Sequence, residues 1–270
     1  MACGTTLEGR WALVLGASSG FGAATARAFS QVGMNVFGVH LDPRRTLERA
    51  QEVIADIEGE GRRACFFNTN AADARRRSRV VRSMSEILAE DGGQVHIVVH
   101  TLAFGSLRPY IAEDPEVAVN QSHMEMTLNV MAHSLVYWTQ DLLRAGLLGN
   151  GSRIYAMSSL GSQRVSSHYG PVSAAKAALE AHTRQLAVEL APQGIAVNCL
   201  MPGVTDTPAF RAIPGNEEIY ERVVAQHPAG RITTAGDVAQ TLVVLADPRL
   251  TWVSGTVIPV DGSEAVVAAG

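Results

Sequence analysis

The sequence is short of cysteine, and this shortage excludes two ways of stabilising a small protein. Its three cysteines, Cys3, Cys65 and Cys199, are too few and too widely spaced for a disulfide framework or a zinc site. We therefore expect no metal. Cys65 and Cys199 fall inside apolar runs, so we expect them to pack as small hydrophobic residues.

Long hydrophobic runs and an excess of positive charge are also missing. No run approaches the ~20 apolar residues of a membrane-spanning helix, and residues 1–10 lack the basic and apolar segments of a signal peptide. The net charge of -4 gives no electrostatic reason to bind nucleic acid. We therefore expect a cytoplasmic protein that binds neither membranes nor nucleic acid. A local basic cluster, which is either a solvated helix face or a docking patch for an acidic carrier, consists of Arg75, Arg76, Arg77, Arg79 and Arg82.

Lysine is almost absent, and the one lysine stands beside residues suited to proton chemistry. Lys176 is the single lysine among 22 basic residues. Tyr169 precedes it by seven positions, and Ser158 and Ser159 lie about ten further upstream. A lysine offers a compact ammonium where arginine offers a planar fork. Serine, tyrosine and lysine together predict a proton-donating phenol whose anion is stabilised by the lysine ammonium. The alternative is that Lys176 is a solvated helix residue and Tyr169 an ordinary packed ring.

A strand, a glycine turn and a helix follow one another near the start of the chain. Trp11–Leu15 is an apolar run of strand length, and a small-residue helix pattern covers residues 23–32. Between them lies GASSGFG, in which glycines let the backbone approach a pyrophosphate and the helix start supplies free N–H groups. The spacing is GxxxGxG and not GxGxxG. The predicted cofactor cradle consists of Gly16, Ser18, Ser19, Gly20, Phe21 and Gly22.

The end of the second predicted strand, residues 35–39, bears on the choice of cofactor. Asp42 either holds the adenosine ribose or, with Pro43, caps a helix over residues 43–58. Arg44 and Arg45 either clasp a 2′-phosphate or face water. The choice between NADH and NADPH therefore stays open.

The remaining pattern alternates strands with helices. Further strands are predicted at residues 63–67, 95–99 and 196–200, at Arg153–Met157 and at Val257–Val260, and helices at residues 74–90, 124–145 and 171–190. Such alternation implies parallel βαβ units wound right-handedly into one open sheet. We predict a single α/β domain over residues 1–270, a Rossmann-like doubly wound parallel sheet of about seven strands with helices on both faces.

Between Pro202 and Arg231 the regular pattern lapses. This stretch follows the predicted sixth strand, at the sheet edge where open α/β proteins bind ligands. Its apolar residues, Phe210 and Ile213 among them, need something to cover. We predict a substrate-binding loop at about residues 203–231 for an apolar substrate; the alternative is a plain surface connection.

Together these motifs resemble the short-chain dehydrogenase/reductase family across nearly the whole chain. The matching parts are GASSGFG, Asn70, Asn129, the serines at 158–159, PGVTDT at 202–207 and VSGTVIPVDG at 253–262. The resemblance implies a Rossmann-like fold, NADPH or NADH as cofactor and a homotetramer. It implies that catalysis falls to Tyr169, Lys176, Ser159 and Asn129. It also implies that the cradle is joined in cofactor binding by His40, Asp42, Arg44, Arg45, Asn70, Ala71, Thr101, Leu102, Ala103, Lys176, Pro202, Gly203, Val204, Thr205 and Thr207.

The spacing of tyrosine and lysine departs from most of that family. Four residues before Lys176, where most members carry the tyrosine, this chain has Val172. On a helix, a separation of seven residues brings two side chains to within about 20° of each other but roughly 10 Å apart along the axis. Gly170 and Pro171 suggest that the helix starts there, with Tyr169 at or before its cap. The phenol would then approach the nicotinamide from a different direction.

A Tyr-x6-Lys spacing is similar to that of the enoyl-acyl-carrier-protein reductases, most of all the type III branch. VVHTLAFG at 98–105 resembles their HSLAF segment. The resemblance implies reduction of the trans-2 double bond of an enoyl thioester, on coenzyme A or acyl carrier protein, in fatty-acid biosynthesis. Tyr169 would bond the enolate oxygen and Lys176 the nicotinamide ribose. The candidate substrate contacts are Phe104, Leu160, Phe210 and Ile213.

Two other functions compete with this one. A carbonyl reductase or alcohol dehydrogenase would reduce a ketone such as a 3-oxoacyl thioester, with Tyr169 donating a proton directly, because fold does not fix function. A non-catalytic dinucleotide-sensing protein would keep the fold without turnover, and such a protein needs neither Tyr169 nor Lys176. Ser19 and Asp42, which depart from the type III pattern, weigh against a fixed preference for NADPH.

Overall fold

A computed structural model of the protein describes residues 7–91 and 93–267. Cys3 and most of the stretch used to judge a signal peptide lie outside the described residues. Cys199 is buried in the core, where burial raises the pKa of its thiol to about 11. Cys65 packs partly buried against the same core. Both therefore pack as the small hydrophobic residues that we expected.

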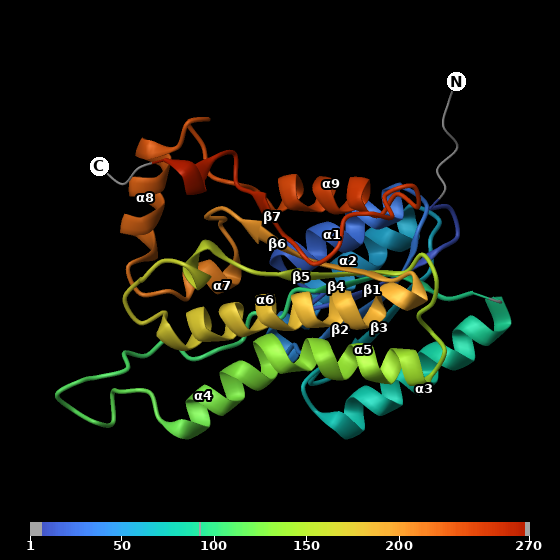
Figure 1. Ribbon diagram of the computed structural model, residues 1–270, viewed down its shortest axis with the longest axis horizontal. Helices are drawn as coiled ribbons and strands as arrows, with labels where there is room; N and C mark the ends of the chain where they lie inside the picture. The colour runs from blue at the N-terminus through green and yellow to red at the C-terminus, as the bar shows by residue number, and fades with distance from the viewer. Residues whose placement is uncertain (1–6, 92, 268–270) are drawn as a thin grey trace.

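The described residues form one seven-stranded sheet in the order β3-β2-β1-β4-β5-β6-β7, with every neighbouring pair parallel (Figure 1). The strands are β1 (Trp11–Leu15), β2 (Asn35–His40), β3 (Ala64–Asn68), β4 (Val95–His100), β5 (Arg153–Met157), β6 (Ala196–Pro202) and β7 (Val257–Val260). Their order reverses between β1 and β4, and such a switch point is where open parallel sheets bind ligands. The predicted doubly wound sheet is confirmed.

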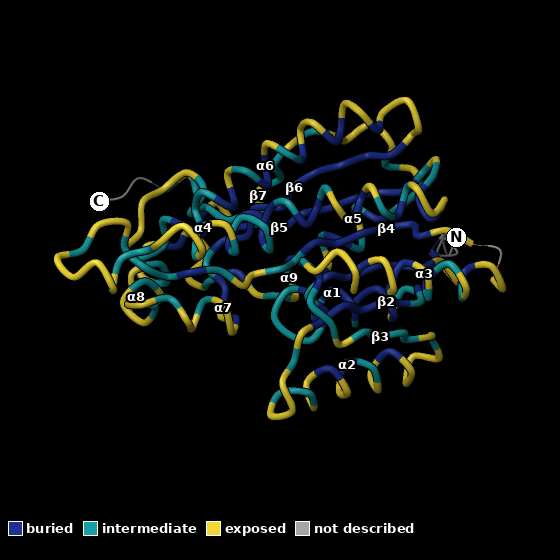
Figure 2. The backbone as a smooth tube through the Cα atoms, turned by 90° about the horizontal axis from the view of Figure 1, so that it is seen from below, coloured by how far each residue is buried: buried dark blue, intermediate teal, exposed yellow. Residues whose placement is uncertain are grey.

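Helices cover both faces of the sheet, and two separate apolar cores lie between the three layers. One core joins the sheet to α3 (Ala74–Asp91), α5 (Ser134–Arg144) and α6 (Gly170–Leu190). The other joins it to α1 (Gly20–Gln31), α2 (Leu47–Gly59) and α9 (Ala235–Leu245). Because both faces are covered, the central strands are buried along their length (Figure 2), which is why they are mostly apolar and do not alternate with polar residues.

The sequence prediction missed α9. This helix begins at a capping box, in which Thr234 Oγ1 accepts from the Asp237 N–H while the Asp237 carboxylate accepts from the Thr234 N–H. Its residues AGDVAQTLVVL are apolar enough to be buried on one side and carry little charge. The capping box was the available signal for its start.

The predicted helix over residues 124–145 is interrupted. It consists of α4 (Gln121–Leu128), a π turn η2 (Asn129–His133) and α5 in direct succession. Such π turns are rare and are found frequently at functional sites. This one begins at Asn129.

The stretch from Pro202 to Arg231 is not irregular throughout, as predicted, but contains two helices. They are α7 (Pro208–Arg211) and α8 (Asn216–Gln226), which lie together at one end of the molecule (Figure 1). Gly215, in the left-handed region at φ 75°, separates them. Across the described residues, every helix is too short or too polar to span a bilayer.

Candidate active site

The glycine turn between β1 and α1 leaves no room for side chains where a phosphate would approach. Gly16 has φ 96°, and a Cβ on it would lie 2.6 Å from Thr101 Oγ1. A Cβ on Gly22 would collide with the Gly16 carbonyl oxygen. The first turn of α1 carries no acidic residue, so its positive dipole end is not neutralised. The predicted cradle therefore fits a dinucleotide pyrophosphate.

Two distant segments hold this turn in place. After β4, Thr101 donates its hydroxyl to the Leu15 carbonyl at 2.7 Å and its N–H to the same oxygen at 2.9 Å. Thr207, after β6, places its methyl carbon 3.4 Å from where a Gly20 Cβ would stand. The turn is thereby joined to the predicted nicotinamide side, where Thr207 and Thr205 are both buried.

Asp42 does not cap the following helix. That helix begins as a 3-10 turn, η1 (Arg44–Thr46), and the N-cap of α2 is Thr46. Instead the Asp42 carboxylate lies 2.9 Å from His40 Nδ1 and accepts the Thr46 hydroxyl at 2.7 Å. Burial raises the pKa of the Asp42 carboxyl, but hydrogen bonds from Ser18, Thr46 and His40 outweigh burial and bring the net pKa below its usual value. The carboxylate thus stands beside the glycine turn, as a ribose ligand would.

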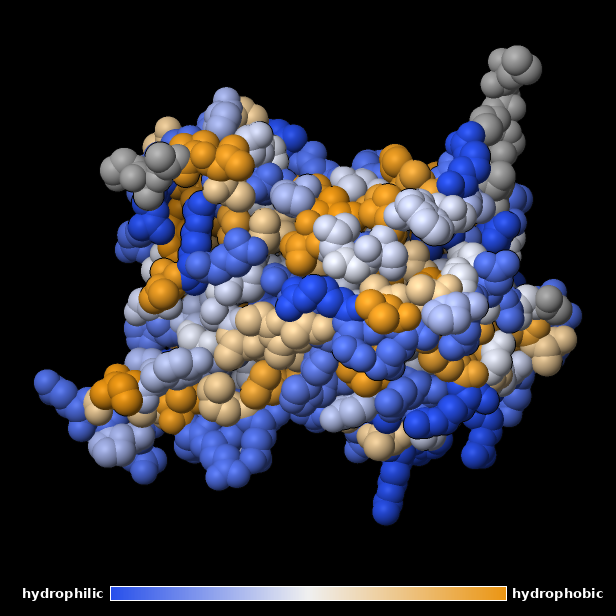
Figure 3. All heavy atoms as spheres, viewed as in Figure 1, coloured by the Kyte–Doolittle hydropathy of each residue, from blue (hydrophilic) through white to orange (hydrophobic). Residues whose placement is uncertain are grey.

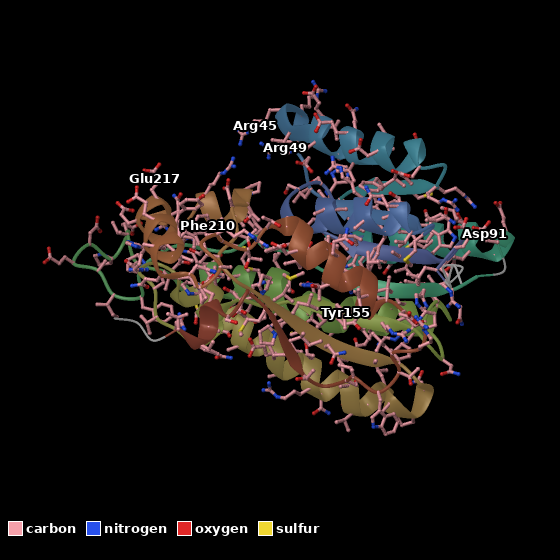
Figure 4. The ribbon with its side chains drawn as sticks, turned by 90° about the horizontal axis from the view of Figure 1, so that it is seen from above. Arg45, Arg49, Asp91, Tyr155, Phe210 and Glu217 are labelled. Atoms are coloured by element: carbon pink, nitrogen blue, oxygen red, sulfur yellow. The ribbon has the colours of Figure 1, made fainter. Side chains whose placement is uncertain are left out.

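Three arginines that follow Asp42 are exposed. Figure 4 shows Arg49 at the start of α2 and Arg45 in the preceding turn η1, both on the side of the molecule where Phe210 lies. Arg44 is exposed on the same 3-10 turn. On the other side of Asp42, Asn68 bonds the Asp42 backbone N–H and carbonyl at 3.0 and 2.9 Å.

The predicted adenine-side residues follow β3. The Asn70 side chain accepts from the Ala72 N–H at 2.9 Å, closing a tight turn, and the carbonyl of the buried Ala71 accepts from Trp138 Nε1 at 2.9 Å. Both residues are held by hydrogen bonds within the protein. Leu102 and Ala103 follow Thr101, just after the end of β4.

Tyr169 is the N-cap residue of α6, as the glycine and proline after it predicted. Its hydroxyl donates to Ser159 Oγ across 3.4 Å, and its ring lies directly over Gly161, where any Cβ would collide with it. Burial raises the pKa of the phenol, while the contact with Ser159 opposes that rise. The structure thus brings Tyr169 and Ser159 together and keeps the phenol protonated at neutral pH.

Lys176 lies two turns further along α6 and is buried. Its ammonium donates to the Met157 carbonyl at 2.6 Å, at the end of β5 and one residue before the serine pair. Burial lowers the pKa of Lys176 to about 8, although the Cys199 thiol and the Glu180 carboxyl act to raise it. A lysine so placed is not the solvated residue of the alternative interpretation.

His100, at the end of β4, is a second buried group near Lys176. Its Nε2 lies 2.8 Å from Ser134 Oγ, which itself donates to the Val130 carbonyl, so Nε2 carries the proton. Nδ1 is buried and has no hydrogen-bond partner among the described residues. Burial, aided by the Lys176 charge, lowers the pKa of His100 to about 3. The ring is therefore neutral.

Asn129 opens the π turn, and this turn packs against α6. Its carbonyl accepts from the Ser134 N–H, the long-range bond that defines the π turn. Asn129 therefore lies in a π turn that packs against α6, the helix of Lys176. The predicted continuous helix over residues 124–145 did not include this turn.

The predicted substrate contacts come from three segments of the chain. Leu160 lies in the 3-10 turn η3 (Leu160–Ser162), Phe210 in α7 and Ile213 just after it, all partly buried. Phe104 is 69% exposed at the start of the long β4–α4 connection. Further along this connection the Tyr110 ring lies over Gly170, the residue after Tyr169, and Ile111 is exposed. Hydrophobic residues are exposed in this region, at the lower left of Figure 3.

Three residues at the site escaped the sequence prediction. Tyr110 had no signal, because its loop carries no periodicity. Glu180 stands four residues after Lys176, a helical spacing that places both on one side of α6. The third, Glu264, lies in the C-terminal 3-10 turn η5 (Glu264–Val266) and accepts the Val204 N–H at 2.8 Å. It holds the predicted nicotinamide loop from far along the chain.

Comparison with protein families gives a match over nearly the whole chain. Residues 16–262 match the family model described as enoyl-(acyl carrier protein) reductase. The chain is 30% identical to an NADPH-dependent aldehyde reductase-like protein of Arabidopsis thaliana, over 95% of this chain and 94% of that protein. It is 24% identical to the NADH-dependent enoyl-[acyl-carrier-protein] reductase of Aquifex aeolicus, over 94% of this chain and 91% of that protein.

A solved structure with similar coverage supports the same grouping. The short chain dehydrogenase of Burkholderia cenocepacia in complex with NADP superimposes with a TM-score of 0.78 at 31% identity. The superposition covers 96% of this chain and 99% of the other.

Proposed function

Because this chain belongs to the short-chain dehydrogenase/reductase family and is an NAD(P)H-dependent oxidoreductase, we propose that it reduces the trans-2 double bond of an enoyl thioester. One observation carries this proposal. At the position where most of the family has its tyrosine, Val172 is 5% exposed and packed in the core. The phenol instead comes from the N-cap of α6.

The residues divide the work as follows. The turn at 16–22 and Asp42 would hold the pyrophosphate and adenosine ends, with Lys176 on the nicotinamide ribose. When bound, the reduced nicotinamide supplies a hydride for the β-carbon of the substrate. Tyr169 would donate a hydrogen bond to the thioester oxygen as negative charge develops there, and such a preorganised donor stabilises a transition state in a water-poor site.

Burial suits Tyr169 and Lys176 to these roles. Burial raises the pKa of Tyr169, so the phenol remains a donor, and a buried cation nearby favours the anion that accumulates on the substrate. Phe104, Leu160, Phe210 and Ile213, with Tyr110, would cover an acyl chain. The apolar character of this set supports an acyl thioester.

A second candidate function has a specific observation in its favour. The relative at 30% identity is named an NADPH-dependent aldehyde reductase-like protein, so carbonyl reduction by the same Tyr169 competes with enoyl reduction. In that reaction the phenol transfers its proton to the carbonyl oxygen. Both reactions would use Tyr169, so an assay of the two substrate classes distinguishes them.

We also propose that the protein serves fatty-acid biosynthesis on an acyl carrier protein or coenzyme A, and that it works as a homotetramer. Exposed apolar residues, including Trp252 at 97% and Val188 at 73%, support association between subunits. Light scattering coupled to gel filtration tests the tetramer. A monomer at micromolar concentration would contradict it.

The decisive assay follows the loss of reduced-nicotinamide absorbance. NADH and NADPH are each offered with crotonyl-CoA, with longer enoyl thioesters and, separately, with acetoacetyl-CoA and a simple aldehyde. Oxidation that depends on the enoyl thioester, with inactive ketone and aldehyde, supports the proposal and identifies the cofactor. Carbonyl reduction without enoyl turnover would replace it with the second candidate.

A further inference from the structure

Glu180 is a buried carboxylate that the proposed reaction does not use. It lies on α6, one turn beyond Lys176, and is 8% exposed. Burying a carboxylate is costly unless hydrogen bonds compensate it. Here one of its oxygens, Oε1, accepts two hydroxyl groups, those of Ser158 and of Ser162, the latter at 2.8 Å.

These two serines bracket the segment that carries Ser159. Ser158 follows β5 directly, and Ser162 ends the 3-10 turn η3. Between them, the Ser159 hydroxyl accepts from the Gly161 N–H at 3.1 Å and from Tyr169 at 3.4 Å. One carboxylate oxygen therefore fixes both ends of a five-residue segment whose middle contacts the phenol.

A second side chain of α6 binds the residue just before this segment. Lys176 donates to the Met157 carbonyl, so two consecutive residues of the chain, 157 and 158, are each bound by a side chain of α6. Tyr169 caps that helix at its start. The Glu180 contacts thus set the Ser159 segment relative to a helix that already carries Tyr169 and Lys176.

We propose that Glu180 is a positioning residue for the reaction: by clamping Ser158 and Ser162 it sets the Ser159 hydroxyl against the Tyr169 phenol. The expected effect on kcat rests on the proposed function. The expected effect on backbone exchange rests on the described contacts alone. A misplacement of about 1 Å at such a site can cost on the order of 100-fold in rate.

The test compares Glu180→Ala and Glu180→Gln with the matched control Glu189→Gln, on the exposed face of the same helix. Activity is measured with whichever substrate the unaltered protein reduces, enoyl thioester or carbonyl. We expect Glu180→Ala to lower kcat by about 100-fold, and Glu180→Gln, which keeps an acceptor oxygen, by less. KM for the dinucleotide should change less than kcat, because the glycine turn that would hold the pyrophosphate is untouched.

A double-mutant cycle separates positioning from general damage. Ser158→Ala/Ser162→Ala should reproduce the loss of kcat, and adding Glu180→Ala to it should cost little more, because the same contacts are already gone. Additive losses would overturn the proposal. So would an unchanged kcat in a folded Glu180→Ala protein.

Hydrogen–deuterium exchange supplies a readout that does not depend on turnover. Amides of residues 158–164 should exchange faster in Glu180→Ala than in the Glu189→Gln control, with the rest of the sheet unchanged. Should no substrate be found, this result alone decides the clamp, so a failure of the proposed function remains distinct from a failure of the proposal. Equal exchange in both variants would overturn the clamp.

Discussion

Tyr169 differs from an ordinary packed tyrosine in what surrounds its hydroxyl. Its ring occupies the space that Gly161 leaves free, which fixes the side chain, and the hydroxyl contacts a serine and not a backbone carbonyl. A phenol held in this way has a direction before any substrate arrives. Preorganisation of this kind is what makes a single donor valuable in catalysis.

We expect Tyr169→Phe to lower kcat by about 100- to 1,000-fold, the usual cost of removing one oxyanion donor. Dinucleotide affinity should stay the same, since the ring is retained and only the hydroxyl is removed. Steady-state kinetics together with the dissociation constant for the reduced dinucleotide check this. Tyr137→Phe, on the outer side of α5, is the control; a variant at 169 with undiminished kcat would remove the residue from the mechanism.

The Lys176 ammonium should give the pH profile its basic limb. Burial brings the pKa of Lys176 down to about 8, so the cation is present below that pH and is lost as pH rises through it. We therefore expect kcat/KM to fall above pH 8, and Lys176→Met to weaken dinucleotide binding and abolish this limb. A profile of kcat/KM against pH and a binding isotherm for each protein suffice. An unaltered dissociation constant would contradict the ribose role.

At the scale of elements, the loop after β6 depends on a turn that lies about sixty residues later. Glu264 accepts the Val204 N–H, and a Gly203 side chain would meet both Glu264 Oε2 and Thr233 Oγ1 at 2.5 Å. Nearby, Asp261 accepts the N–H groups of Ser263 and Ala265, which shapes the turn that presents Glu264. The end of the chain thereby limits how the nicotinamide loop can move.

Glu264→Ala should raise KM for the dinucleotide by about tenfold, because a hydrogen bond to a charged group is lost and the loop 203–207 loosens. The effect on kcat should be smaller. Kinetics and hydrogen–deuterium exchange over residues 203–207 measure both consequences. Glu217→Ala, at an exposed position on α8 (Figure 4), serves as the control; equal KM values in the two variants would show that the contact does not hold the loop.

Elements with regular periodicity were predictable from the sequence, and the site was predictable only in part. β1, β5 and β7 begin and end at the predicted residues. The π turn at Asn129 and the two helices after Pro202 were not predictable, because tertiary packing and a left-handed Gly215 decide them. Asp42 shows the same limit. An Asp-Pro pair is a good cap locally, yet the contacts with His40, Thr46 and the glycine turn prevail.

At the scale of the whole molecule, stability rests partly on neutral histidines inside the fold. His96 in β4 is buried, with Nε2 2.8 Å from the Ala246 carbonyl after α9 and Nδ1 3.1 Å from Arg10. An arginine can only donate, so Nδ1 accepts and Nε2 carries the proton. Burial lowers the pKa of His96 to about 4, a shift that the Arg10 and Arg153 charges enlarge and the bond to Ala246 opposes.

When the pKa of a histidine is lower in the folded than in the unfolded protein, its contribution to stability is fully present above the unfolded pKa. That contribution is lost as pH falls toward the folded pKa. Between pH 6.5 and 4 we expect His96 to cost on the order of 3 kcal/mol of unfolding free energy. Urea unfolding at several pH values should show a shallower acid dependence for His96→Gln than for the unaltered protein. His168→Asn, at a partly exposed position, is the control, and identical slopes in all three proteins would exclude His96 as the cause.

The solitary lysine makes the chain its own reporter of unfolding. An endoproteinase specific for lysine has one peptide bond to cut, the bond after Lys176, and that bond lies in the middle of α6 with its side chain buried. Cleavage therefore requires that this helix leave the sheet, and when opening is fast its rate follows the population of the opened state. Two fragments of defined length would accumulate at that rate, and a dinucleotide that binds the native fold would slow their appearance in proportion to its occupancy.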